Sequence, residues 1–324
     1  MDKTPIPCRK DSHLLTARQP ERRSEDSCTT SASLADCIRK ARSELATSLP
    51  GGGATCSEAG GGRRLHVVRH GERVDFTFGG DWFLENCFDS SGNYRVLDAN
   101  LPTEIPRRAG APATFDRDCP LTKVGVAQAA ATGVAMSDAG VAITRAYSSP
   151  ALRCVQTARE ILAALGVDRQ VALRIEPALF EWMTWFREIR PTFLTAAEML
   201  DFGFNIDTCY ESIMEDRELH IDETLDEYYA RSHRVMRAIV AAATHDDDDI
   251  LVVAHGASLD VLTRNLIGRL SRDEQEFQRV LSRTPYCSAA ACEQTPDGWR
   301  LVAPPARSLR HEKSFRHNIL EVLQ

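Results

Sequence analysis

The sequence predicts an α/β fold, a doubly wound and mostly parallel sheet with helices on both faces and a long insertion after the first strand. From Leu65 onward, patterns typical of strands alternate with patterns typical of helices. Two β-branched runs, 65–69 and 250–254, each end at a His-Gly step, as buried parallel strands do where they meet a loop. Ligands bind beyond the carboxyl ends of such strands in open α/β sheets, so we expect a site there.

The individual elements follow from the same periodicities. Short apolar or β-branched runs predict strands at 65–69, 143–148, 174–176, 250–254, 286–294 and 299–302. Longer segments with helical spacing predict helices at 122–137, 152–165, 195–199, 224–244, 259–268 and 271–282. The segment 76–121 contains Gly, Pro and aromatic residues with little periodicity, which indicates a long and usually functional insertion. The acidic run 246–249 predicts a solvated loop before the next strand.

The first residues differ from the rest of the chain. Residues 1–63 are rich in Ser, Thr, Arg and Gly and contain two glycine triplets, so they cannot bury enough apolar surface to offset the entropy of ordering. We therefore predict a disordered, low-complexity tail at 1–63 and a folded domain at 64–324.

Composition excludes several classes of function. The chain has 324 residues, of which 43% are hydrophobic, enough for a full core. The net charge of −7 without a basic stretch argues against nucleic acid. No apolar run approaches the roughly 20 residues of a membrane span, and the polar N-terminus carries no signal-like apolar region. The ten cysteines form no CxxC motif, so we expect no disulfide framework and a reduced, cytoplasmic protein.

Cationic and imidazole side chains gather around the two strand ends. Arg69 and Arg73 flank His70 after the first strand, and His255 follows the strand at 250–254. Arg153 stands at a strand-to-helix transition, where free backbone N–H groups also favour anions. Guanidinium groups bind phosphate oxygens in pairs, and phosphoryl transfer requires mainly positioning and positive charge. The constellation therefore predicts a phosphate site that contains a histidine nucleophile.

Several segments around these residues form a wider pattern: RHGERVD (69–75), Phe78-Gly79 with Trp82, 87–89, 120–122 with Gly125 and Gln128, SSPALRCVQTA (148–158), 176–177, LFEW (179–182), and 253–255 with Ser258-Leu259. Over about 65–305, this pattern resembles the histidine phosphatase superfamily, which has the phosphoglycerate-mutase-like fold. The resemblance extends to the branch that contains the suppressor-of-T-cell-receptor-signalling (Sts) proteins and the insect ecdysteroid-phosphate phosphatases.

The resemblance implies specific roles. His70 matches the nucleophile that forms a phosphohistidine, and Glu181 matches the residue that protonates the leaving oxygen. The pocket for the phosphoryl oxygens would comprise Arg69, Arg73, Arg153 and His255. No metal or other cofactor is implied, because the arginines supply the neutralising charge. Between Phe180 and Trp182, the Glu181 carboxyl is expected to be partly desolvated, which favours a general acid.

The residues leave alternatives open. Glu176 could replace Glu181 as the acid, and both could be structural. The clusters Phe180, Trp182, Trp185, Phe186 and Phe76, Phe78, Trp82 could either line the pocket or pack in the core. Phosphoglycerate mutase or bisphosphatase activity would need further cations for a substrate carboxylate, for which Arg95, Arg107 and Arg108 are candidates. A catalytically silent binding module is the third reading.

The expected partner is a phosphorylated small molecule, such as a steroid phosphate, or a phosphotyrosine protein. No nucleic acid and no membrane is expected, and relatives of this type suggest a homodimer.

Overall fold

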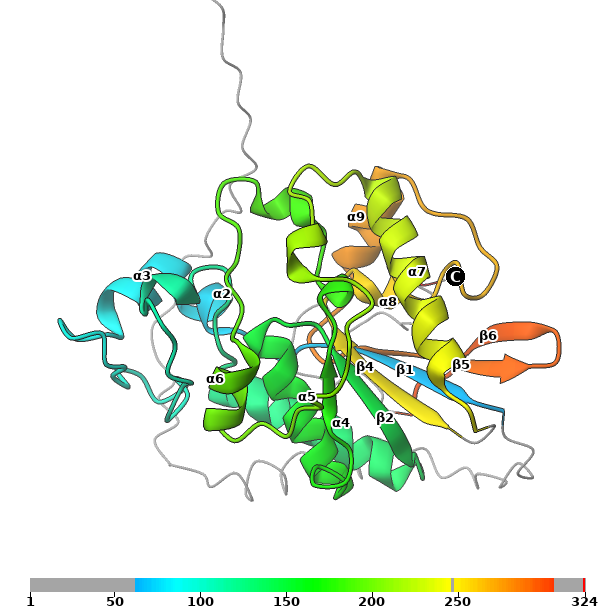
Figure 1. Cartoon of the computed structure of the whole chain (residues 1–324), viewed down its shortest axis with the longest axis horizontal. Coiled ribbons are helices and arrows are strands. Elements are labelled where there is room, and N and C mark those ends of the chain that lie inside the picture. Colours follow the sequence, from blue (N-terminus) through cyan, green and yellow to red (C-terminus); the bar gives the residue numbers. More distant parts are fainter. Residues whose placement is uncertain (1–61, 246–247, 306–322, 324) are drawn as a thin grey trace, which may run out of the picture.

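The computed structural model describes residues 62–245, 248–305 and 323 (Figure 1). Almost all of the tail predicted at 1–63 lies outside the described residues. At the centre lies a single sheet with the strand order β3-β2-β4-β1-β5-β6. Its strands are β1 (Arg64–Arg69), β2 (Ile143–Ser148), β3 (Leu173–Ile175), β4 (Asp249–Ala254), β5 (Ala289–Thr295) and β6 (Gly298–Val302).

The sheet is mostly parallel, as predicted. β4 pairs in parallel with β1 and β2, and β2 with β3, whereas β5 runs antiparallel to both β1 and β6. The predicted strand at 286–294 begins later, at Ala289, because the chain turns first. Cys287 has a positive φ of 54°, and the Ser288 amide donates to the Pro285 carbonyl at 3.2 Å.

Both faces of the sheet are buried. Successive residues of a strand point to opposite faces, and Val67 and Val252 accordingly belong to one apolar core, while Val68 and Val253 belong to the other. This is why the strands read as continuous apolar runs rather than alternating ones.

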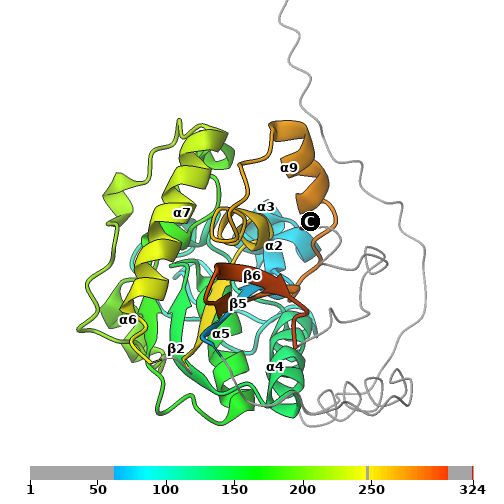
Figure 2. The ribbon, with the colours of Figure 1, turned by 90° about the vertical axis from the view of Figure 1, so that its right-hand side faces the viewer.

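Helices supply the other half of each core (Figures 1 and 2). α4 and α5 cover one face, and α7, α8 and α9 cover the other. The α-helices are α2 (Val74–Phe78), α3 (Gly80–Asn86), α4 (Lys123–Asp138), α5 (Leu152–Leu165), α6 (Ala196–Asp201), α7 (Leu225–Ala242), α8 (Ser258–Val261) and α9 (Glu274–Leu281).

Local sequence explains where the main helices begin and end. The Thr122 hydroxyl accepts the Gly125 amide at the start of α4, and Thr224 with Glu227 forms a capping box at the start of α7. α5 ends at Gly166, which has a left-handed conformation with φ 73° that glycine adopts without strain.

Three sequence predictions were wrong in detail. The insertion is not irregular throughout, because α2 and α3 follow β1 directly; both are too short to show a clear period. The helix expected at 259–268 is reduced to α8. In the acidic run, Asp248 and Asp249 are buried rather than solvated. Asp248 accepts from the Thr144 hydroxyl at 2.6 Å, and Asp249 accepts from the Ala142 amide at 3.0 Å.

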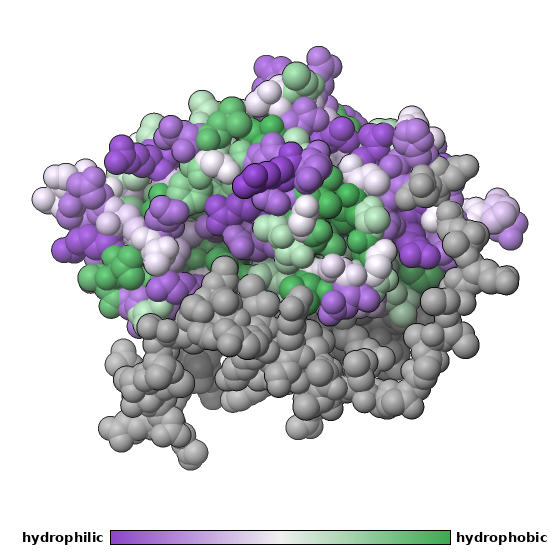
Figure 3. Space-filling model, turned by 90° about the horizontal axis from the view of Figure 1, so that it is seen from below, coloured by the Kyte–Doolittle hydropathy of each residue, from purple (hydrophilic) through white to green (hydrophobic). Residues whose placement is uncertain are grey.

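Among the described residues, no helix combines the length and apolar character that crossing a bilayer requires. The face of the molecule seen in Figure 3 mixes hydrophilic residues with small hydrophobic patches.

Candidate active site

Strand pairing brings the two predicted histidines together. β1 and β4 are in parallel register with Arg69 opposite Ala254, and the amide of His70 donates to the Ala254 carbonyl at 3.0 Å. The next residue of each strand therefore leaves the sheet at the same level. The rings of His70 and His255 lie with their centroids 5.6 Å apart and their planes 73° apart.

The His70 ring is held as a neutral imidazole with one free nitrogen. Its Nδ1 lies 2.8 Å from the Gly71 carbonyl oxygen, which can only accept, so Nδ1 carries the proton and Nε2 keeps its lone pair. Burial lowers the pKa of His70 well below 6.5, and the charges of Arg153, Arg69 and Arg73 lower it further. An unprotonated Nε2 is the form that a nucleophile requires.

His255 is held between a hydroxyl and a guanidinium. Its Nε2 lies 2.8 Å from the Ser149 Oγ, and Arg153 Nη2 lies 3.3 Å from its Nδ1. Because Arg153 can only donate, Nδ1 accepts and Nε2 donates to Ser149. Burial, then the charge of Arg153, lowers the pKa of His255 well below 6.5. The ring is neutral, and Nε2–H already has a partner.

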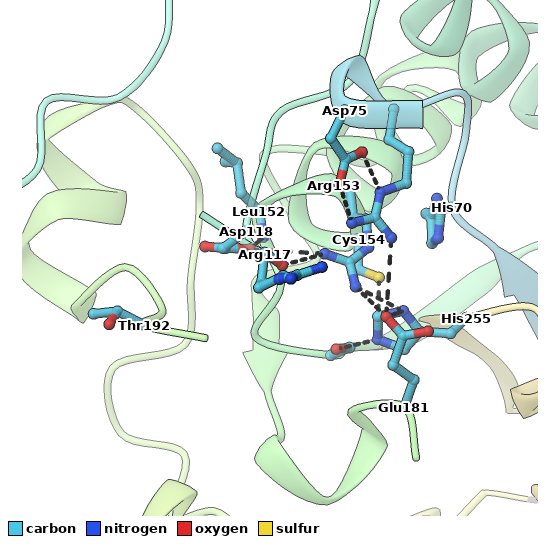
Figure 4. Close-up of polar contacts among 12 residues, drawn as sticks. His70, Asp75, Arg117, Asp118, Leu152, Arg153, Cys154, Glu181, Thr192 and His255 are labelled. Carbon is cyan, nitrogen blue, oxygen red and sulfur yellow. Dashed lines mark hydrogen bonds and ion pairs between the residues drawn. The ribbon is translucent and has the colours of Figure 1, made fainter. Parts of the chain in front are cut away.

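Arg153 is the central cation of the site (Figure 4). It lies in the first turn of α5 with its side chain fully buried. Its Nη2 donates to Glu181 Oε1 at 2.5 Å, and its Nη1 donates to the Arg117 carbonyl at 3.3 Å. These acceptors orient the guanidinium, whose buried Nε has no hydrogen-bond partner among the described residues.

The two arginines beside His70 are oriented by different neighbours. Arg73 makes a bidentate pair with Asp75, at 2.6 and 2.5 Å, and its Nη1 lies 4.0 Å from Glu181 Oε1. Arg69 donates to the Thr284 carbonyl, and its guanidinium carbon lies 4.4 Å from the centre of the Tyr286 ring. Both charges act on His70. The predicted cationic residues thus gather beside the two imidazoles, and we call this cluster of Arg69, Arg73, Arg153, His70 and His255 the cup.

Glu181, rather than Glu176, reaches the cup. Glu181 Oε1 lies 3.5 Å from His255 Nδ1, in addition to its contact with Arg153. Glu176 is fully buried elsewhere, where it accepts from the Ala178 amide at 2.9 Å and from the Tyr210 hydroxyl and the Ile213 amide at 2.7 Å each. These hydrogen bonds indicate that Glu176 stabilises the 3-10 turn that it precedes.

The expected surroundings of Glu181 were only partly right. Its side chain is 12% exposed, so it is largely desolvated. However, its immediate neighbours are the guanidinium groups of Arg153 and Arg73 rather than the adjacent aromatic rings.

Cys154 also borders the cup but is not poised to react. Its Sγ donates to the Ala254 carbonyl at 3.3 Å and lies 3.8 Å from His255 Nε2. Burial raises the pKa of this thiol to about 12. It is therefore a neutral thiol, which is a poor nucleophile.

Sequence reasoning missed several residues that support the cup. The Ser149 hydroxyl and the Asp75 carboxylate lie inside motifs that were recognised, so their positions were available without their roles. The contact of Thr284 and Tyr286 with Arg69 had no local signal, because it joins segments more than 200 residues apart. Thr157 links two motifs, accepting the Gly71 amide at 3.0 Å and donating to the Arg153 carbonyl at 2.7 Å.

The aromatic residues divide between core and surface. Phe180 is fully buried and packs edge-on against His255, with ring centroids 5.1 Å apart, and Trp182 and Phe186 are also buried. Phe76, by contrast, is 69% exposed and lies over Arg73, 4.3 Å from its guanidinium carbon to the ring centre. Phe78 and Trp82 stack on each other, with centroids 5.3 Å apart.

Within the residues that the structure describes, no group of three or more His, Cys, Asp or Glu side chains is placed to hold a metal ion.

Comparison with known families agrees with this geometry. The model of the histidine phosphatase superfamily (branch 1) matches residues 107–305, which include Arg153, Glu181 and His255. The chain belongs to the histidine phosphatase superfamily. The ecdysteroid-phosphate phosphatase of Drosophila melanogaster is 40% identical over 256 residues, covering 78% of this chain and 33% of that protein. Ubiquitin-associated and SH3 domain-containing protein A of Mus musculus is 38% identical over 252 residues, covering 77% of this chain and 40% of that protein.

A solved structure confirms the phosphoglycerate-mutase-like fold predicted for this histidine phosphatase domain. The ecdysone phosphate phosphatase of Bombyx mori, in complex with tungstate, superposes with a TM-score of 0.66 at 31% identity, covering 80% of this chain and 99% of that one. The chain spans 33% and 40% of the two curated relatives above, so it corresponds to part of their length.

Proposed function

We propose that this protein is a metal-independent phosphatase that hydrolyses phosphate monoesters through a phosphohistidine at His70. The observation that carries the proposal is the state of that ring: Nδ1–H is held by the Gly71 carbonyl, so Nε2 is unprotonated, and the charges of three arginines act on the ring. Guanidinium groups neutralise the phosphoryl oxygens and stabilise the charge that develops on them, which is the principal requirement of phosphoryl transfer.

The first chemical step follows from this arrangement. His70 Nε2 attacks phosphorus, the bond from phosphorus to the ester oxygen breaks, and that oxygen leaves as an alcohol or phenol. Glu181 is the carboxyl that contacts the cup, so it is the group that protonates the leaving oxygen.

The second step regenerates the enzyme. Water attacks the phosphohistidine, Glu181 accepts its proton, and inorganic phosphate leaves. His255 stays neutral, with its Nε2–H donated to Ser149, so its role is to line the cup and orient the phosphoryl group rather than to transfer a proton.

For the substrate, we propose an ester with an apolar leaving group, either a steroid phosphate or a phosphotyrosine residue. The exposed ring of Phe76 beside Arg73 provides an apolar face at the rim of the cup. The ecdysteroid-phosphate phosphatases of Drosophila and Bombyx among the relatives agree with the first of these substrates.

Mutase activity is disfavoured by one of the arginines considered for a substrate carboxylate. Arg108 is buried, pairs with Asp118 at 3.1 Å and donates to the Thr192 carbonyl at 2.7 Å. Its guanidinium is therefore neutralised by Asp118 and is not placed to bind a substrate carboxylate.

The test is an assay of purified protein on p-nitrophenyl phosphate, a phosphotyrosine peptide, an ecdysteroid phosphate and 3-phosphoglycerate, with and without EDTA. We expect hydrolysis that survives EDTA, an acid-labile phosphoenzyme after rapid quenching, and loss of both in His70→Ala. Hydrolysis that needs added metal would refute the mechanism. Isomerisation of 3-phosphoglycerate without phosphate release would establish mutase activity instead. The homodimer and the cytoplasmic location remain proposals, tested by size-exclusion chromatography and imaging.

A further inference from the structure

A buried ion pair lies behind the loop that carries Glu181. Arg231 projects from α7, and Glu223 stands just before the Thr224 cap of that helix. Their side chains are 5% and 7% exposed and are joined by two hydrogen bonds, Nε to Oε1 at 2.6 Å and Nη2 to Oε2 at 2.8 Å. Buried pairs of this kind are costly to desolvate, so satisfied partners around them indicate a specific task.

Every donor of Arg231 is used, and three of them bind the main chain of one short loop. Nη1 donates to the carbonyls of Ala178 and Phe180 at 2.7 and 2.8 Å, and Nη2 donates to the carbonyl of Glu181 at 3.3 Å. With the two bonds to Glu223, this accounts for all five N–H groups of a guanidinium. Arg231 thus holds Glu181 through its main-chain carbonyl, while the Glu181 side chain enters the cup.

Glu223 holds the residues that follow. Its carboxylate accepts the Met183 amide at 3.3 Å, and its carbonyl accepts the Trp182 indole N–H at 2.7 Å and the Thr184 hydroxyl at 2.6 Å. Arg231 and Glu223 therefore bind the chain through hydrogen bonds on both sides of Glu181. Short 3-10 turns flank that residue, so the regular hydrogen bonds of an α-helix or a strand are not what holds it.

We infer that Arg231 and Glu223 are positioning residues for the general acid, which fix the main chain of 178–184 so that the Glu181 carboxyl meets the leaving oxygen. This inference rests on the proposed function and assigns a task to two residues that do not touch the substrate. A displacement of a catalytic group by about 1 Å can reduce the rate by roughly 100-fold, and these two residues bind the main chain or side chains of 178–184 through six hydrogen bonds.

The test compares two substrates of similar size that need the acid to different degrees. Phenyl phosphate has a strongly basic leaving group that requires protonation, whereas p-nitrophenyl phosphate has a weakly basic one that departs without much help. The quantity measured is kcat/KM, which reports phosphoryl transfer to His70 rather than the later hydrolysis. The main variant, Arg231→Met with Glu223→Met, removes both charges together and leaves no unpaired ion in the core.

We expect kcat/KM of this double variant to fall by about 30- to 100-fold for phenyl phosphate, and by less than about 3-fold for p-nitrophenyl phosphate. Adding the same changes to Glu181→Gln should cost less than about 2-fold more, because the acid to be positioned is already gone. Arg237→Met, an exposed arginine of the same helix, is the matched control and should leave both rates unchanged.

Equal losses for the two substrates, or full additivity with Glu181→Gln, would overturn the inference and leave a purely structural pair. If the double variant does not fold, Arg231→Lys supplies the same test, since one ammonium group cannot replace five fixed donors. A wild-type protein that releases phosphate from neither substrate would instead refute the proposed function itself.

Discussion

The two histidines of the cup should make the folded protein sensitive to weak acid. Burial and the charge of Arg153 hold the pKa of His70 and of His255 well below 6.5 in the folded chain. Unfolded, both rings are solvated and have the ordinary value. Below about pH 6.5, the unfolded chain therefore binds protons that the folded chain does not, and the free energy of unfolding decreases as the pH falls.

The magnitude follows from linkage. Each histidine contributes a slope of about 1.4 kcal/mol per pH unit, and the pair about 2.7 kcal/mol per pH unit. This slope applies from about pH 6 downward, and it levels off at the lowered pKa values of the folded state. Above about pH 7.5 both rings are neutral in both states, so their contribution to stability no longer changes with pH.

Urea denaturation followed by circular dichroism between about pH 7.5 and pH 5 measures this slope. His70→Asn places an amide N–H where Nδ1–H meets the Gly71 carbonyl, and His255→Gln places one where Nε2–H meets Ser149, so each keeps its hydrogen bond without titrating. Below about pH 6, each should reduce the slope by about 1.4 kcal/mol per pH unit. His220→Asn, at an exposed histidine, is the control. An unchanged slope in both variants would mean that these rings are protonated in the folded protein, and the argument for a neutral nucleophile would fail.

Three further substitutions test the supporting structure. Ser149→Ala removes the partner of the buried His255 Nε2–H, so we expect unfolding to become easier by about 1–3 kcal/mol; an unchanged urea midpoint would contradict the assigned hydrogen bond. Gly125→Ala would place a Cβ 2.2 Å from the Glu72 carbonyl oxygen. We expect this clash to destabilise the fold by about 1–3 kcal/mol and so to lower the thermal midpoint. Gly80→Ala, where the added Cβ would meet only the Asp75 Cβ at 3.8 Å, is the control. Phe76→Ala, at an exposed ring, should alter stability by less than about 0.5 kcal/mol. It should raise KM for p-nitrophenyl phosphate by roughly 3- to 10-fold but not for methyl phosphate; equal effects on both would refute an apolar rim.

Much of the site could be predicted because its key residues lie in local patterns. His70 and His255 each follow an apolar strand, and a strand end is recognisable from a few residues. Arg153 was found because it begins a helix directly after a strand, where an anion site is expected. Parallel pairing of β1 with β4 then brings the two histidines to one edge, as the fold class implies.

The remaining features depend on contacts between distant segments. The antiparallel direction of β5 follows a turn that contains a residue with positive φ, and the burial of Asp248 depends on Thr144 and Arg145 of a neighbouring strand. Neither contact leaves a trace in the spacing of nearby residues. The helices α2 and α3 were missed because short helices carry too few turns to establish a period.

The sequence alone predicted the fold class, which the structure confirms, and proposed the nucleophile and the cations, because strand ends and flanking charges are properties of short segments. The tertiary structure decided which carboxyl enters the cup. Glu176 and Glu181 lie five residues apart on the same irregular stretch, and their directions depend on how that stretch is held: Tyr210 binds the first carboxyl, and Arg231 binds the main chain of the second. Such choices arise from packing between elements far apart in the chain, which no local pattern records.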